Sequence, residues 1–474
     1  MLKIYNALTK QKEEFKSIET GKIGMYVCGP TVYDHCHLGH GRGYVSMDVI
    51  RKYLEYIGYE VRYIMNYTDV GHLVNDAEVG EDKIQVKAKN EQVDPMEIVE
   101  KYITSSKEDF DALNIKSANF FPRPTQYVAQ IIKFIEGLIE KGFAYEVNGS
   151  VYFSVEKFPE YGKLSGRKTE DLLSGARVEV NNEKKNPLDF ALWINAPKEH
   201  LLKWKSPWGE EGYPGWHIEC SVMSCDLLGQ TTFDIHGGGN ENIFPHNENE
   251  VAQSEAYLGE KMANYWVLWN MVNVEGVKMS KSLGNFTTIK DALAKYEPSV
   301  IRLWIISSHY RSVINYNPDS LEQAKINLQS ISSWIGKLNS ITLEEGVENI
   351  DISSFKKEFD EAMNDDFNTP VALSVIYKLI TEANKKQLSK TDASSVLALW
   401  EKWNKVLGLR IETDSQNDIP ENIQELLKER ELARKEKDFA EADRIRDILT
   451  KKGFAIEDSG DGTKITIQNP NTKI

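Results

Sequence analysis

The chain has 474 residues, of which 41% are hydrophobic and 27% are charged. This composition is typical of a globular protein, and the length suffices for about three domains of about 150 residues each. Four cysteines cannot form the framework of a disulfide-stabilised protein, and no uncharged apolar run reaches the roughly 18 residues of a membrane span. The beginning of the chain, Met1–Asn6, lacks the pattern of a secretory signal, so we expect a cytoplasmic protein with no membrane partner.

The charge balance is acidic, with 57 lysines and arginines against 72 acidic residues and a net charge of −15. This argues against a protein that coats nucleic acid non-specifically, because affinity for phosphate comes from Lys and Arg. A nucleic-acid partner bound by a local basic strip stays compatible with it. The simpler interpretation is that the net charge keeps the protein in solution.

Two apolar segments near the beginning of the chain are predicted to be strands joined by a helix. Ile23–Pro30 is an apolar run that ends at a glycine and a proline, which interrupt a strand. Apolar residues then recur at helical spacing from Val45 to Ile57, and Val61–Tyr67 is a second apolar run. This order predicts parallel strands with a right-handed crossover.

A second αβ half is predicted further along the chain. Thr232–His236 resembles a strand and runs into three glycines, and a helical stretch near Asn249–Leu258 precedes the apolar run Tyr265–Trp269. The region between the halves, about residues 121–203, is rich in turn residues. We therefore predict an α/β protein whose parallel-sheet domain is split by an insertion.

Beyond about Asn317 the pattern changes to helix, with apolar residues three and four apart that indicate a bundle. The polar segment 411–420 ends in a proline and is predicted to be a linker. After it, Glu425–Lys437 and Phe439–Lys451 have the pattern of a charged helical hairpin. Taken alone, this pattern favours a solvated hairpin over a contact with RNA.

The turn after the first predicted strand carries a cluster of histidines and glycines, Thr31–Gly43. Glycines at 39, 41 and 43 would let the backbone approach a ligand closely, and a helix beginning here would present free N–H groups to an anion. His37 and His40 are three residues apart, so a helix places them on one face, where both could stabilise charge on a phosphate. A capped helix start with incidental histidines explains the pattern equally well.

A second cluster, Val277–Asn285, has two lysines, Lys278 and Lys281, that flank small polar residues. Lysines in such a loop suit a mobile phosphate clamp, because each is a point charge on a flexible stem. By itself, the cluster is more simply an ordinary solvated loop.

Together the two clusters resemble the signature motifs of class I aminoacyl-tRNA synthetases, His37-Leu-Gly-His40 being the first and Lys278-Met-Ser-Lys-Ser282 the second. Further segments look like the cysteinyl-tRNA synthetase family, densely to about residue 320 and more loosely to the end: Cys28–Asp34, Leu172–Arg177, Ser206–Gly209, Gly215–Cys220, Phe244–Glu250 and Ser308–Arg311.

The resemblance implies a Rossmann-like catalytic domain split by an inserted domain, then a helical-bundle tRNA-binding domain and a small C-terminal domain. The expected parts are catalytic half 1 (1–120), the inserted connective domain (121–203), catalytic half 2 (204–285), a stem-contact region (286–317), the helical bundle (318–410) and the C-terminal domain (421–474).

The resemblance also implies one Zn²⁺ per chain, held by Cys28, Cys220, His246 and Glu250. His246 and Glu250 are four residues apart, so a helix would place both on one face, and all four side chains are acceptable zinc ligands. Zinc would act as a selectivity filter, because shape alone separates cysteine from serine poorly whereas a borderline-soft metal prefers sulfur. The other cysteines, Cys36 and Cys225, match no ligand position and are expected to be structural.

The implied reaction activates L-cysteine with ATP and Mg²⁺ to cysteinyl-adenylate and then transfers the cysteinyl group to tRNA(Cys). His37 and His40 would contact the triphosphate, and Lys278 and, more importantly, Lys281 would hold the departing pyrophosphate. The remaining family positions fall on Gly39, Gly238 and Glu241 for ATP and on Thr68, Trp216 and His236 for the amino acid.

The sequence departs from the family pattern in places. Glu241 replaces a common aspartate, Asn247 replaces a common histidine, and Val70–Asp82 is longer than in many relatives. The usual tryptophan near the C-terminus is missing. Two alternatives stay open: a mycothiol-pathway cysteine ligase, which lacks a long RNA-binding C-terminal part, and a catalytically inactive relative that binds nucleotide or RNA. We expect a monomer.

Overall fold

A computed structural model of the protein describes residues 1–74, 80–169, 183–229, 231–279, 284–342, 350–411, 421–452, 454–459 and 462–467. Lys281, most of the predicted linker and the segment Leu172–Arg177 therefore lie outside the described residues. The chain divides into two units: Met1–Trp334 with Leu338–Ile411, and Ile335–Lys337 with the C-terminal segment from Glu412. Among the described helices, none is both long and apolar enough to cross a membrane.

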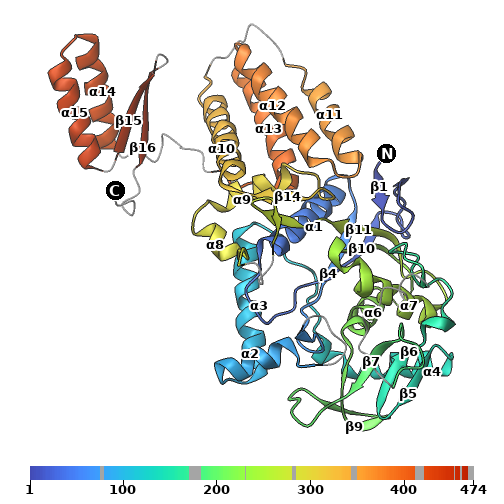
Figure 1. Ribbon diagram of the computed structural model, residues 1–474. Helices are drawn as coiled ribbons and strands as arrows, with labels where there is room; N and C mark the ends of the chain where they lie inside the picture. Colours follow the sequence, from blue (N-terminus) through green and yellow to red (C-terminus); the bar gives the residue numbers. More distant parts are fainter. Residues whose placement is uncertain are drawn as a thin grey trace. The chain divides into compact units, whose positions relative to one another are not determined.

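The first unit is built on a parallel sheet of four strands in the order β11-β10-β3-β4 (Figure 1). Its strands are β3 (Lys22–Val27), β4 (Glu60–Met65), β10 (Phe233–Gly239) and β11 (Ala263–Trp269). All four match the apolar runs in the sequence, and their parallel pairing confirms the predicted α/β class.

The crossover helix α1 (Leu38–Tyr56) joins β3 to β4 and begins before the apolar stripe that predicted it. The order of the strands reverses between β3 and β10, because β4 lies on one side of β3 while β10 and β11 lie on the other. In open parallel sheets, ligands bind at such a switch point, beyond the carboxyl ends of the strands. A ligand-binding site is therefore expected among the residues that follow Val27 and Gly239.

The inserted region forms an antiparallel sheet of five strands in the order β5-β6-β7-β9-β8. These strands are β5 (Ala144–Val147), β6 (Ser150–Phe153), β7 (Phe190–Asn195), β8 (Trp204–Ser206) and β9 (Gly209–Pro214). The sheet extends past the predicted domain boundary at residue 203, because β9 pairs with both β7 and β8. It shares an apolar core with α4 (Val128–Glu140), α6 (Trp216–Leu227) and α7 (Glu248–Leu258).

The first unit contains further helices and strands at the beginning of the chain, after β4 and after β11 (Figure 1). The beginning of the chain forms a hairpin of β1 (Lys3–Asn6) and β2 (Gln11–Glu14). Two helices follow β4: α2 (Lys83–Glu91) and α3 (Pro95–Ala112). Beyond β11 follow β12 (Val272–Val274), β13 (Val277–Lys278), α8 (Ile289–Leu293), α9 (Pro298–Ile306) and β14 (Ile314–Tyr316). The predicted helical part contains α10 (Pro318–Asn339), α11 (Ile352–Asn364), α12 (Thr369–Lys385) and α13 (Lys390–Leu407).

The second unit has its own small core. Helices α14 (Glu421–Lys435) and α15 (Phe439–Lys451), at the predicted charged hairpin, are followed by the strand pair β15 (Phe454–Ser459) and β16 (Gly462–Ile467). Buried apolar side chains from both helices and β15 form the core: Ile423, Ile445, Leu449, Phe454 and Ile456.

A buried arginine joins the helical part to the sheet domain. Arg302 on α9 pairs with Asp48 on α1, and its guanidinium also donates to the carbonyls of Leu407 (2.6 Å) and Leu113 (2.8 Å). Arg302 and Asp48 are both almost completely buried. Removal of the arginine takes from Asp48 one of its two cationic partners, Lys52 being the other, and leaves the two carbonyls without this donor.

We expect Arg302→Met to lower the free energy of unfolding by about 3–5 kcal/mol. Thermal or urea denaturation measures this loss. The matched control is Lys378→Met, which breaks an exposed pair with Glu358 and should cost no more than about 1 kcal/mol. Equal effects of the two substitutions would contradict a structural role of the buried pair.

Candidate metal centre and nucleotide site

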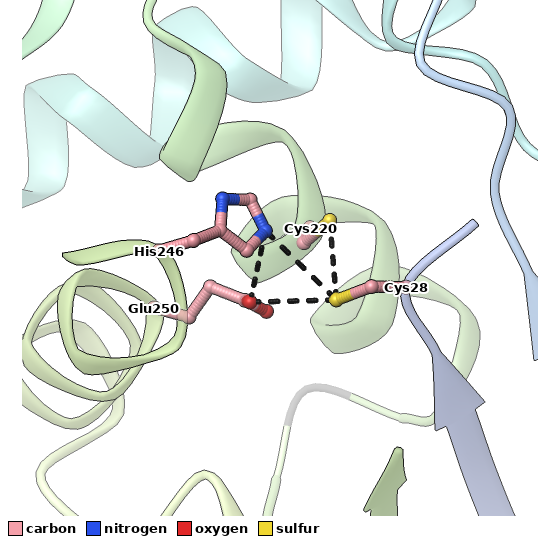
Figure 2. A group of neighbouring side chains, drawn as sticks. All are labelled: Cys28, Cys220, His246 and Glu250. Atoms are coloured by element: carbon pink, nitrogen blue, oxygen red, sulfur yellow. Dashed lines mark hydrogen bonds and ion pairs between the residues drawn. The ribbon is translucent and has the colours of Figure 1, made fainter. Parts of the chain in front are cut away.

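Four side chains from distant segments converge beside the switch point (Figure 2). Cys28 directly follows β3, and Cys220 lies on α6. His246 lies in the short helix η5 (Ile243–Asn247), which runs directly into α7, and Glu250 lies in the first turn of α7. All four are buried, and their ligand atoms lie within 4.8 Å of one another. Among the described residues this is the one group of at least three such side chains that could hold a metal ion.

The distances within this metal cluster fit a small four-coordinate ion. Sγ of Cys28 lies 4.0 Å from Sγ of Cys220, 3.8 Å from Nε2 of His246 and 3.5 Å from Oε1 of Glu250. Nε2 of His246 lies 3.1 Å from the same carboxylate oxygen. A tetrahedral zinc site, with bonds of about 2.3 Å to sulfur and about 2.0 Å to nitrogen, separates its ligand atoms by about 3.3–3.8 Å. The residues present therefore fit zinc.

The electrostatics of the metal cluster favour a cation. The Cys28 thiol donates to Sγ of Cys220, and this hydrogen bond lowers the pKa of Cys220 to about 6 and raises the pKa of Cys28. Burial opposes ionisation of Glu250, but the nearby His236 and His246 outweigh it and lower the pKa of the carboxyl group. Burial also opposes protonation of His246, but Glu250 and Cys220 raise its pKa to about 10. Thiolate and carboxylate are the forms that bind metal.

Three further side chains hold the cluster's ligands in place. Nδ1 of His217 lies 2.9 Å from Nδ1 of His246, so the opposite nitrogen of His246 faces the other ligands. Nε2 of His236 donates to Oε2 of Glu250 (2.8 Å), and the amide of Asn247 donates to Oε1 (2.9 Å). Such outer contacts orient ligands and tune metal affinity. His236, predicted to bind substrate, is fully buried and contacts the carboxylate of Glu250.

The predicted phosphate-binding histidines cap the beginning of α1. Nδ1 of His37 accepts from the backbone N–H of His40 (3.2 Å), and Nδ1 of His40 accepts from the N–H of His37 (3.3 Å). The two rings stack, with centroids 3.7 Å apart. Because each Nδ1 accepts, each neutral ring carries its hydrogen on Nε2. The capped-start and phosphate-binding interpretations are thus compatible: one nitrogen caps the helix and the other can donate to an anion.

Met279 of the second signature motif and residues 286–287 lie against the first motif. Leu38 N–H donates to the carbonyl of Thr287 (3.0 Å), and the ring of Phe286 packs edge-on against His37. A methyl group on Gly39 would lie 3.6 Å from Cε of Met279. Lys278, at the end of β13, is exposed and next to Met279. The structure thus brings the helix start close to Met279 and to the residues that follow the lysine segment.

The glycines at the end of β10 bring the remaining predicted ATP contacts to the same edge of the sheet. Gly238 lies at the carboxyl end of β10, and a methyl group there would lie 3.5 Å from Oδ1 of Asn247. A methyl group on Gly239 would lie 2.5 Å from Oε1 of Glu241. The longer acid at 241 therefore folds back against the glycine backbone.

The predicted amino-acid contacts also lie near the metal cluster. Thr68 is buried, its hydroxyl accepts from the amide of Asn66 (3.0 Å), and its backbone pairs with Thr31. Trp216 begins α6, and its ring centroid lies 4.4 Å from that of His246. Trp216 thus contacts a predicted metal ligand, and Thr68 is connected to Cys220 through Asn66, whose Oδ1 lies 3.9 Å from the Cys220 sulfur. Contact of Thr68 and Trp216 with substrate stays a prediction.

Models of known protein families match most of this chain and identify the family to which it belongs. Residues 14–326 match the model of the class I (C) tRNA synthetase catalytic domain, residues 358–412 match the DALR domain, and residues 416–465 match the cysteinyl-tRNA ligase anticodon binding domain. The chain belongs to the cysteinyl-tRNA synthetase family. The resemblance on which the sequence predictions rest is thereby confirmed.

Relatives cover this synthetase almost from end to end. A cysteine–tRNA ligase of Chlorobaculum tepidum is 45% identical over 97% of this chain and 98% of its own length. One from Thermococcus gammatolerans is 46% identical, covering 98% of both chains. Among solved structures, a Mycobacterium tuberculosis methionyl-tRNA synthetase in complex with methionyl-adenylate has a TM-score of 0.57 at 14% identity, and it covers 82% of this chain and 90% of that chain. That likeness confirms the predicted fold of the synthetase.

Sequence reasoning about this synthetase missed two contacts of the metal cluster. His217 precedes Cys220 by three residues on α6, so helical spacing could have placed it on the same face. Asn247 drew notice as a departure from the family, yet its hydrogen bond to Glu250 is visible only in the folded chain.

Proposed function

We propose that the protein ligates L-cysteine to tRNA(Cys) in two steps, with the metal cluster selecting the substrate thiol. The observation that carries the proposal is the convergence of two thiols, an imidazole and a carboxylate at the switch point of a class I synthetase sheet. Zinc bound there would supply a sulfur-seeking Lewis acid that discriminates cysteine from serine.

Different residues of the chain have different roles in the first step. Cys28, Cys220, His246 and Glu250 would hold the ion and so fix the thiol end of the substrate. The cysteine carboxylate attacks the α-phosphorus of ATP, accompanied by Mg²⁺, and pyrophosphate leaves. Nε2–H groups of His37 and His40 donate to the phosphate oxygens as charge develops, and Lys278 and Lys281 neutralise the departing pyrophosphate.

In the second step, the cysteinyl group passes from the adenylate to the terminal ribose of the tRNA. The helical part α10–α13 and the α14–β16 unit would bind the tRNA and orient its end toward the switch point. This long C-terminal part favours tRNA over the amino sugar of the mycothiol pathway as the acceptor.

Three assays on one preparation test the proposal. We expect cysteine-dependent ATP–pyrophosphate exchange, charging of tRNA(Cys) with cysteine, and no transfer to the amino sugar. Serine should support exchange far more weakly than cysteine. Exchange without tRNA charging would support the cysteine-ligase alternative, and absence of exchange would support a nucleotide- or RNA-binding relative.

A further inference from the structure

In the stretch that is longer than in many relatives, residues 70–82, the structure describes 70–74 and 80–82, and Gly71 lies against the beginning of α6. Its two ends pair with each other: Val74 N–H donates to the carbonyl of Glu81 (2.9 Å), and Lys83 N–H donates to the carbonyl of His72 (3.0 Å). These two hydrogen bonds join the described ends of the stretch, which we call its base, and fix the backbone of His72.

The base of the stretch packs directly on the beginning of α6. Gly71 has a φ of +83°, and a methyl group on it would lie 2.6 Å from Oε1 of Glu219 and 2.7 Å from the carbonyl oxygen of Pro214. A side chain at 71 would collide with both, so the glycine allows the backbone to lie against the helix start. The next residue, His72, is thereby brought to the first residue of α6.

His72 stacks flat on Trp216. The ring centroids lie 3.8 Å apart, the ring planes differ by 10°, and His72 is only 8% exposed. The same indole lies 4.4 Å from the ring of His246 in the metal cluster. Trp216 therefore contacts His72 and a predicted metal ligand at once.

Both nitrogens of His72 are held by neighbours. Nδ1 lies 2.6 Å from the hydroxyl of Thr31, and Nε2 lies 2.7 Å from Nζ of Lys83. An ammonium group only donates, so Nε2 accepts and Nδ1–H donates to the hydroxyl. The imidazole is locked in one plane and one tautomer, because any rotation breaks both contacts.

We infer that His72 is a positioning residue for the amino-acid substrate: it fixes the plane of Trp216, and with it the wall of the amino-acid pocket beside the metal cluster. The inference rests on the proposed function and on the prediction, drawn from the family resemblance, that Trp216 contacts the amino acid. A pre-ordered wall costs little on binding, whereas a rotatable indole must be ordered each time substrate enters.

The test is the Michaelis constant for cysteine in ATP–pyrophosphate exchange. We expect His72→Ala to raise the KM for cysteine about tenfold, while kcat, the KM for ATP and the metal content stay within about twofold of wild type. His72→Phe keeps an aromatic ring on Trp216 and should recover most of the affinity. A merely structural role would move none of these constants selectively and would gain nothing from phenylalanine.

A matched control lies in the same unit. His200 stacks on Tyr213 with nearly the same geometry, 3.9 Å and 10°, and also hydrogen-bonds a neighbour, Gln85. His200→Ala should leave the KM for cysteine unchanged. The inference is overturned if His72→Ala resembles wild type, if it raises both KM values equally, if His72→Phe is no better than alanine, or if His200→Ala has the same effect.

Failure of the proposed function has a separate signature. If wild type catalyses exchange with another amino acid, the proposed substrate is wrong, and the KM for that amino acid then decides the role of His72. If wild type catalyses no exchange, the proposed function and the role of His72 fail together. If wild type is active with cysteine, the proposed substrate is right, and the His72 variants alone decide whether His72 positions Trp216.

Discussion

Cys220→Ser should lose the metal and with it the activation of cysteine. The Cys220 sulfur is the more acidic of the two in the metal cluster, because it accepts the hydrogen bond from the Cys28 thiol. A serine hydroxyl does not ionise in this range and is a poor ligand for zinc. Changes to outer contacts of metal ligands alone cost about 10–100-fold, so loss of a ligand should lower kcat/KM for cysteine by more than about 100-fold.

Metal analysis and ATP–pyrophosphate exchange on the same preparation measure this result. The control is Cys225→Ser: Cys225 lies on the same helix and is buried, but it is outside the metal cluster. It should retain one metal ion per chain and near-normal exchange. A Cys220→Ser variant that keeps both the metal and its activity would refute the assignment of the metal cluster.

The sheet could be predicted from the sequence because each strand and its crossover leave a local apolar pattern. The runs that begin at Ile23, Val61, Thr232 and Tyr265 all became neighbouring parallel strands. The inserted sheet was harder to delimit. β8 is only three residues long, and β9 is poor in apolar residues over its first half, so nothing local indicates that β9 pairs with β7 and β8.

The metal cluster shows where sequence patterns fail. Cys28 and Cys220 meet only because β3 ends beside α6, and no periodicity spans such a distance along the chain. Their pairing was available only from the family resemblance. The contact between His246 and Glu250 could be predicted from spacing, and it holds because the short helix η5, which carries His246, continues directly into α7. His72 left no signal, since a loop histidine carries no pattern that points to its partner.

His37→Asn should separate the two roles of the first signature histidine. Asparagine is a good helix N-cap, so its side-chain oxygen can replace Nδ1 of His37 as the acceptor for the His40 N–H. It cannot replace the donor on Nε2, which extends further from the backbone. We expect kcat for exchange to fall about 100- to 1,000-fold, as for loss of a charge-stabilising donor, with an unchanged melting temperature.

His37→Ala is the companion variant, because it removes both the cap and the donor. It should lose about the same activity and, in addition, about 1 kcal/mol of stability. Metal content should be normal in both variants, since His37 lies outside the metal cluster. If His37→Asn keeps wild-type kcat while His37→Ala is only less stable, the histidine is a helix cap and the charge developing on the phosphate must be neutralised elsewhere, with His40 and the lysine segment as the groups to test.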